Sequence, residues 1–483
     1  MSEQNNTDKV KQTGPSMQKN MGLFALGTVL TKILSFCIAP VYSYFLSTSD
    51  FGVIDLLSSL ASLIYPALTL AVQEAVLRFV LSDNDNAKNY FSNGLLVFGI
   101  GAICLATAPF IIGIWYPNNG ISVTVYYLSY FLFTFLQVFS KSLNKTVSYS
   151  LSSIIYSVIT VGCIILFLNF TNLGANGYFY GMAIGSLAAF SYLFFRLKVW
   201  TYVSFSAIKK DFLLEMVRYS APLILNNVSY WIISGSDKLV TIAVLGEDAA
   251  GILSVVHKIP TLCTLAYSIF YDAYVIEALS KHSKGGTDEN LFYSSLFNDV
   301  LAVLSIGLGA IVLLSWPITL LYEQSYREAW LYIPLYSFGT ILGSVRNFYA
   351  PFFMIRKKTG RLTCYVLIGS AINLATCFLL MKFANLGLWA TALSTILGNG
   401  FICVAVIIGS KRYISIKPSI APVVTSLIAI ITCLLPCFGL DLVWLYILSG
   451  LAFGAIVALN LKRTIRIVKS FVEDYRPRKE TTL

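Results

Sequence analysis

Apolar residues run in long segments that short polar turns separate. From Met21 to Leu46 the only charged residue is Lys32, and a turn from Ser47 to Gly52 leads into a second apolar segment that ends near Arg78. Each segment exceeds the ~20 residues that an α-helix, rising ~1.5 Å per residue, needs to cross ~30 Å of hydrocarbon. The pair therefore predicts a membrane-spanning helical hairpin.

This layout recurs along the whole chain. Length and hydropathy predict about fourteen transmembrane helices, with approximate limits 21–46, 52–79, 90–115, 122–143, 148–170, 173–196, 219–245, 250–279, 293–321, 330–355, 362–383, 386–410, 419–439 and 441–461. The predicted fold class is therefore an all-α integral membrane protein.

Composition agrees with this class. The 483 residues are 57% hydrophobic and 12% charged, whereas soluble domains carry about 25% charged residues. The net charge of +11 could suggest nucleic acid, but the basic residues lie in short loops between apolar segments, where topology places them. We therefore expect membrane lipids, and no nucleic acid, as partners.

The positions of the basic residues predict the orientation. If the N-terminus is cytoplasmic, 28 of the 34 lysines and arginines fall on the inward side and only Arg327 and Lys382 on the outward side. This predicts a multi-pass protein of the cell's inner membrane with both termini cytoplasmic. Residues 1–20 lack the features of a signal peptide, so the first span is expected to be retained. Four bases remain inside spans: Lys32, Lys238, Lys258 and Arg346.

Weak internal repeats divide the chain. The step from Leu46 to Gly52 has a counterpart from Leu245 to Gly251, and Gln73-Glu74-Ala75 is echoed by Tyr271-Asp272-Ala273. We predict two pseudo-symmetric six-helix lobes plus two C-terminal helices, with a substrate path between the lobes. The predicted parts are a cytoplasmic tail (1–20), an N-lobe (21–196), an interfacial linker (197–218), a C-lobe (219–410), spans 13 and 14 (411–461) and a basic cytoplasmic tail (462–483).

Several short motifs carry a family resemblance over essentially the whole chain. They are Leu46-Ser-Thr-Ser-Asp-Phe-Gly52, Leu77-Arg78-Phe79, Ser236-Asp237-Lys238, Leu245 to Gly251 running into Lys258-Ile259-Pro260, and Leu321 to Tyr326. With them the chain resembles the Wzx-type polysaccharide or O-antigen flippases, in the superfamily of multidrug, oligosaccharidyl-lipid and polysaccharide exporters.

The resemblance implies an activity. Such a flippase moves an undecaprenyl-pyrophosphate-linked oligosaccharide to the outer leaflet by alternating access, for surface polysaccharide such as O-antigen or capsule, and its product would feed polysaccharide polymerase machinery. Where the family often has Asp-Arg in the seventh span, this chain has Asp237-Lys238, and a lysine cannot form the bidentate phosphate contact of an arginine.

The intramembrane bases are the candidate substrate site. A lysine or arginine at a helix centre costs roughly 2.5–3.5 kcal/mol on insertion scales, so four of them are expected to line a cationic cavity for pyrophosphate, and Arg78 is included in this predicted site. The alternative is that each lysine snorkels or pairs with a nearby acid, as Lys238 could with Asp237.

Acidic residues are the candidates for ion coupling. Glu74 and Asp272 are related by the repeat, and Asp237 lies beside Lys238. A carboxylate at low dielectric could exchange protons, but Glu74 also precedes Arg78 by four residues, the spacing of a helix-surface ion pair. His257 is interpreted as a packed or pore-lining residue rather than a proton relay.

No motif for catalysis or cofactors is present. The nine cysteines lie in apolar segments without a CxxC pair, only two histidines occur, and there is no P-loop or nucleophile elbow. We therefore expect no metal, cofactor or enzymatic activity. The alternatives are a lipid II flippase, a multidrug exporter of the same superfamily or, from another class, a polytopic polysaccharide polymerase. The sugar and the coupling ion stay open.

Overall fold

The structure, a computed structural model, describes residues 33–34, 36–105, 107–282, 289–356, 358–439 and 441–475. Every regular element in these ranges is a helix, which confirms the all-α fold class. The chain forms two compact units, 1–231 (unit 1) and 232–483 (unit 2), and the boundary falls inside one helix, α9 (Lys210–Leu245). Each unit is described by itself.

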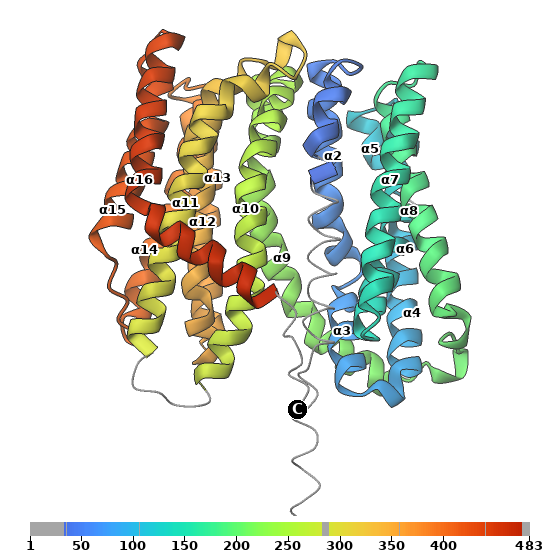
Figure 1. The fold of residues 1–483 in the computed structure, drawn as a ribbon. Coiled ribbons are helices and arrows are strands. Elements are labelled where there is room, and N and C mark those ends of the chain that lie inside the picture. The colour runs from blue at the N-terminus through green and yellow to red at the C-terminus, as the bar shows by residue number, and fades with distance from the viewer. Residues whose placement is uncertain are drawn as a thin grey trace, which may run out of the picture. The chain divides into compact units, whose positions relative to one another are not determined.

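Unit 1 is a bundle of the first helices (Figure 1). Besides the first part of α9, it holds α2 (Thr48–Leu68), α3 (Val72–Ser82), α4 (Ala87–Leu105), α5 (Ala108–Trp115), α6 (Gly120–Ser142), α7 (Thr146–Phe170) and α8 (Ala175–Leu197). Within it α8 packs against α6 and α7, and α3 packs against α4 and α6.

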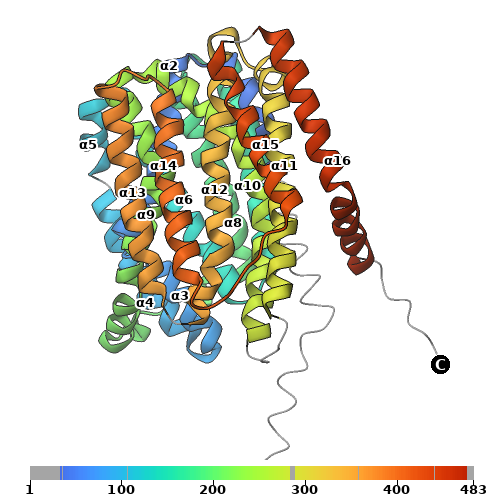
Figure 2. The ribbon, with the colours of Figure 1, turned by 90° about the vertical axis from the view of Figure 1, so that its left-hand side faces the viewer.

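Unit 2 repeats this plan and adds two helices. It holds the rest of α9, α10 (Glu247–His282), α11 (Glu289–Thr319), α12 (Ala329–Ile355), α13 (Thr359–Lys382), α14 (Trp389–Ser410), α15 (Ile420–Cys433) and α16 (Leu442–Tyr475). Here α14 packs against α12 and α13, and α10 packs against α12. Figure 2 shows the added helices α15 and α16 beside α11, as their contacts require.

Ten of the described helices are long and apolar enough to cross a membrane, so the protein is a multi-pass membrane protein. The predicted spans 250–279 and 330–355 correspond to α10 and α12, whereas 52–79 and 90–115 are each divided into two helices. The number fourteen stays a prediction, and so do the predicted lobe boundaries.

The division of the second span occurs at Leu70 and Ala71. Both residues have φ of +50°, and the Ala71 N–H donates to the Pro66 carbonyl at 2.8 Å. A left-handed conformation costs a residue with a side chain roughly 1–2 kcal/mol. The Leu68 carbonyl beside this break lies only 2.6 Å from where a Cβ on Gly101 would stand, so a residue without a side chain lets α4 approach it.

Each unit fixes a connecting segment with polar side chains of one helix. In unit 1, Ser92 and Asn93 of α4 bond backbone groups of residues 202–209, which we call strap 1. In unit 2, the α11 side chains of Asn290, Ser294 and Asn298 accept from the backbone N–H groups of residues 415, 417 and 419, within strap 2 (415–419). Backbone N–H and C=O groups outside long helices need other partners, so these side chains stabilise straps 1 and 2.

Candidate functional site

A tight turn at Gly246 joins α9 to α10 and places the candidate site. Gly246 has φ of +93°, which favours glycine, and its N–H bonds the carbonyls of Thr241 and Ile242 at 3.1 and 3.2 Å. Asp237 lies nine residues before this turn and His257 eleven residues after it. At ~1.5 Å per residue, both side chains lie at a similar depth, roughly 14–16 Å from the turn.

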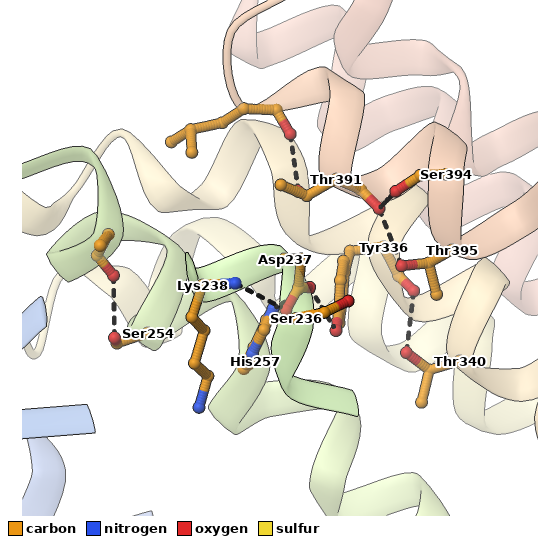
Figure 3. Close-up of polar contacts among 12 residues, drawn as sticks. Ser236, Asp237, Lys238, Ser254, His257, Tyr336, Thr340, Thr391, Ser394 and Thr395 are labelled. Carbon is orange, nitrogen blue, oxygen red and sulfur yellow. Dashed lines mark hydrogen bonds and ion pairs between the residues drawn. The ribbon is translucent and has the colours of Figure 1, made fainter. Parts of the chain in front are cut away.

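The Asp237 carboxylate is the centre of a buried polar cluster (Figure 3). Its side chain is 1% exposed, and Oδ2 lies 3.0 Å from Nε2 of His257. The Tyr336 hydroxyl on α12 donates to the same oxygen at 3.4 Å, and the Tyr336 ring stacks on the imidazole with centroids 4.5 Å apart. Three helices therefore meet at one carboxylate, and we call Asp237, His257 and Tyr336 the Asp–His cluster.

The contact between His257 and Asp237 is close but is not an aligned hydrogen bond. The distance is short, yet Nε2 is buried without a partner in hydrogen-bond geometry. The other carboxylate oxygen, Oδ1, accepts the backbone N–H of Lys238 at 2.9 Å. Polar groups close to both oxygens stabilise a buried carboxylate, because burial of an uncompensated charge is costly.

The two lysines of this hairpin differ in burial. Lys238 is 8% exposed, and Figure 3 shows its ammonium group pointing away from the Asp237 carboxylate. Lys258 follows His257 and is partly buried. The structure thus brings Asp237 to the backbone of Lys238 and to the imidazole of the next helix, and places the Lys238 ammonium elsewhere.

Arg346 lies deeper along α12. It is 7% exposed, its Nη1 donates to Oδ1 of Asn399 on α14 at 3.3 Å, and its Nε donates to Oδ1 of Asn347 at 3.3 Å. Asn399 is itself oriented by a 3.0 Å bond from Nδ2 to the Gly339 carbonyl. Ten residues separate Arg346 from Tyr336, about 15 Å of helix, so the two sites in unit 2 lie at separate depths.

In unit 1 the candidate residues lie on α3. Arg78 is exposed and its guanidinium stands over the Tyr219 ring, 4.3 Å from the centroid. Glu74 is partly buried, and its charged neighbour is Lys141 of α6. Within the described residues Glu74 and Arg78 form no salt bridge, although their spacing would allow one.

Two predicted residues receive no description. Lys32 lies outside the described residues, and Asp272 lies on α10 at a position whose side chain is not described. The grouping of all five bases around one cavity therefore stays a prediction.

The sequence did not predict three contacts of the candidate residues: those of Asp237 with His257 and Tyr336, and that of Arg346 with Asn399. A signal for His257 was available, because Gly246 lies midway between Asp237 and His257 and an antiparallel hairpin would bring them level. No comparable signal exists for Tyr336 or Asn399, since α12 and α14 are far away in sequence and their rotation is decided by packing.

Known proteins share this architecture. A family model described as "Polysaccharide biosynthesis protein" matches residues 17–282, more than half of the chain. No curated protein matches the sequence significantly.

Solved structures resemble the fold over most of its length. A structure titled "Lipid II flippase MurJ, inward closed conformation" has a TM-score of 0.66 at 13% identity, over 92% of this chain and 99% of that one. An inward-facing multidrug resistance MATE family transporter of the MOP superfamily has a TM-score of 0.59 at 14% identity, over 82% of this chain and 94% of the other. At such identities the likeness establishes the fold of these transporters.

Proposed function

Because the chain belongs to the polysaccharide biosynthesis protein family, we propose that it is a flippase for an undecaprenyl-pyrophosphate-linked oligosaccharide. It carries this lipid from the cytoplasmic to the outer leaflet of a bacterial inner membrane by alternating access, with both termini in the cytoplasm. The flipped lipid serves surface polysaccharide synthesis, such as O-antigen or capsule, and passes to polymerase machinery.

The observation that carries the proposal is buried positive charge inside a transporter fold. Arg346 and Lys238 are 7% and 8% exposed in unit 2, at positions within helices where a base costs roughly 2.5–3.5 kcal/mol on insertion scales. Intramembrane bases mark pathways, and a pyrophosphate is the anionic part of the proposed substrate. We propose Lys238, Lys258, Arg346, Arg78 and Lys32 as its binding residues.

The Arg346 environment suits a phosphate contact. Its guanidinium donates to two amide oxygens, those of Asn347 and Asn399, which orient the group. An arginine held in this way can bind a phosphate through two parallel N–H bonds. Asp237, Glu74 and Asp272 are the proposed coupling residues.

The test is transbilayer movement in liposomes that contain the purified protein. Fluorescent undecaprenyl-pyrophosphate oligosaccharide, fluorescent lipid II and a lipophilic cationic dye are compared, with an outside quencher reporting accessibility. The proposal predicts fast movement of the oligosaccharide lipid. Protein-free liposomes provide the control, because unassisted flipping of so large a polar group is slow.

One alternative has a specific observation in its favour. The fold matches a lipid II flippase over 92% of this chain, so lipid II is the second candidate substrate. Preferential movement of lipid II would replace the first proposal, and movement of the cationic dye alone would indicate a multidrug exporter. Lengthening of sugar chains without movement would identify a polymerase.

A further inference from the structure

The buried side chain of Asp237, on α9, is contacted by side chains of two other helices, α10 and α12. His257 reaches it from α10 at 3.0 Å and Tyr336 from α12 at 3.4 Å, while the carboxylate is 1% exposed. From the sequence alone, His257 is interpreted as a packed or pore-lining residue. In the structure its buried Nε2 faces a carboxylate rather than an apolar surface. A packing role alone does not explain why an ionisable pair occupies this depth.

The surrounding groups leave few sites for a proton. Lys238 on α9 and Lys258 on α10 adjoin the pair, and Cys377 of α13 lies near the carboxylate and bonds Ser394 of α14. Lysine, tyrosine and cysteine side chains ordinarily titrate at about pH 8.5 or above, whereas histidine ordinarily titrates at about 6.5. The imidazole of His257 and the carboxylate of Asp237, 3.0 Å apart, are therefore the two groups here that can share one proton.

We propose that Asp237 and His257 form a proton-binding site, which holds the last nine residues of α9 to α10 and α12 when one proton is bound. With that proton, a carboxylate meets an imidazolium and the pair has no net charge. Without it, a carboxylate faces a neutral ring, and the attraction between the two opposite charges, which is strong at low dielectric, is lost. Loss of the proton therefore weakens the contact between the helices.

This inference rests on the proposed function for its consequence, since it would link flipping to a proton gradient. The last nine residues of α9, from Asp237 to Leu245, end at the Gly246 turn, and separation of this segment from α10 would open that part of unit 2. Tyr336 acts as a positioning residue, because its ring stacks on the imidazole and its hydroxyl bonds the carboxylate.

The chain offers a direct measurement of the proton, because it contains two histidines, His257 and His282. In the His282→Gln variant, labelled with 15N-histidine and held in lipid nanodiscs, one imidazole signal remains and is followed from pH 5 to 9. Adding Asp237→Asn removes the carboxylate charge at constant shape. We expect this substitution to change the pH midpoint of the His257 signal, because the carboxylate and the imidazole lie only 3.0 Å apart.

Tyr336→Phe keeps the ring stack and removes the hydroxyl bond, so a smaller change in the midpoint is expected. Glu323→Gln, a substitution in a distant loop, is the matched control and should leave the midpoint unchanged. A His257 midpoint that Asp237→Asn does not move would overturn the site. This readout needs no substrate, so it stands or fails independently of the proposed flippase activity.

Flipping in liposomes then tests the coupling. The wild type should move the oligosaccharide lipid faster with an imposed pH gradient than without one, and His257→Gln should move it at the same rate in both conditions. A His257→Gln variant with the wild-type response, or a wild type without any response, would overturn the coupling. If the wild type moves none of the lipids, the proposed function fails while the imidazole titration still decides the site.

Discussion

The two units share a plan but differ at their second spans. In both, one helix packs against two neighbours in the same order, α8 with α6 and α7 in unit 1, and α14 with α12 and α13 in unit 2. Both have a strap fixed by polar side chains. The second span, however, breaks at Leu70 and Ala71 in unit 1, whereas its counterpart α10 runs unbroken for 36 residues in unit 2.

The two units differ in the kind of energetically unfavourable feature that they contain. Unit 1 contains strained backbone, at two residues in left-handed conformation. Unit 2 contains buried ionisable side chains, in the Asp–His cluster and at Arg346. Strained backbone and buried charge both persist only where the surroundings hold them. The two units therefore share their helix packing, and each has an unfavourable local feature of a different kind.

The largest expected effect concerns the helix pairs that both units share. A Cβ on Gly185 of α8 would lie 2.0 Å from Oγ1 of Thr160 and 2.9 Å from the Tyr156 carbonyl, and a Cβ on Gly398 of α14 would lie 2.9 Å from the Gly369 carbonyl. Overpacking costs about 1–3 kcal/mol. We expect Gly185→Ala to lose about 3 kcal/mol and Gly398→Ala about 2 kcal/mol, as lowered Tm in detergent.

The matched control for these substitutions is Gly162→Ala on α7. Nothing lies within 4 Å of a Cβ there, so alanine should leave Tm unchanged or raise it through helix propensity. Equal Tm values for Gly185→Ala and Gly162→Ala would contradict the close approach of α7 and α8.

The straps provide the next comparison. Asn93 accepts the Lys209 N–H at 3.2 Å and donates to the Ala207 carbonyl at 3.0 Å, so Asn93→Ala leaves two backbone groups without their partner and should cost about 2 kcal/mol. Asn298 accepts one strap N–H, from Ser419 at 2.7 Å. Asn298→Ala should therefore cost less, about 1 kcal/mol.

Amide hydrogen exchange at the two straps measures this difference. Asn93→Ala should speed exchange around Lys209, and Asn298→Ala around Ser419. Asn89→Ala is the control, because that side chain donates only to Asn86 and contacts no strap. Exchange that stays slow in Asn93→Ala would show that strap 1 is held by other contacts.

The break in the second span predicts a substitution that stabilises. Leu70 has φ of +50° and is 38% exposed, whereas Leu81 of α3 is 49% exposed within a helix. Glycine adopts left-handed conformations without the penalty that other residues pay. We expect Leu70→Gly to gain up to about 1 kcal/mol and Leu81→Gly to lose about 1 kcal/mol. Tm shifts of the same sign would show that Leu70 is not left-handed.

The smallest effect concerns one loop in each unit, the loop between α11 and α12 in unit 2 and the loop between α5 and α6 in unit 1. In unit 2, the hydroxyl and backbone N–H of Ser325 donate to Glu323 and hold the pKa of that carboxyl below its usual range. In unit 1, the corresponding loop is tied by neutral groups, with Asn119 and Ser122 bonding Asn176 at 3.2 and 2.5 Å.

Only the loop of unit 2 should depend on pH. A lowered carboxyl pKa contributes stability above the unfolded value, about pH 4.3, and this stability is lost as pH falls through the folded value. The Tm of Glu323→Gln should therefore lie slightly below that of the wild type at pH 6, and the two should converge near pH 3. Asn176→Ala should lower Tm equally at both pH values.

Local pattern was sufficient for much of the fold. Segment length and hydropathy located most of the described helices, and the repeat of Leu46 to Gly52 at Leu245 to Gly251 located two corresponding breaks between helices. The predicted turn from Ser47 to Gly52 is too long, because α2 already begins at Thr48. The break at Leu70 and Ala71 was not predictable, because neither residue favours left-handed backbone and the glycine that lies beside the break, Gly101, belongs to another helix, α4.

The site was predictable in part for a similar reason. Asp237, Lys238 and Arg346 stood out because charge inside an apolar segment is visible in sequence. Their contacts were not visible, since Asn399 and Tyr336 come from helices whose rotation depends on packing between distant segments. His257 was within reach, because its distance from Gly246 nearly equals that of Asp237.

The most direct test of the account is the rate at which the fluorescent oligosaccharide lipid flips in liposomes, for the wild type, Arg346→Gln and Lys382→Gln. Arg346 is buried in unit 2, and Lys382 is an exposed base at the end of α13. Loss of a buried charge contact to phosphate should slow flipping at least tenfold, since charge-assisted bonds contribute about 1.5–3 kcal/mol. Lys382→Gln should match the wild type. Equal flipping by all three proteins would contradict a substrate path lined by the buried bases of unit 2.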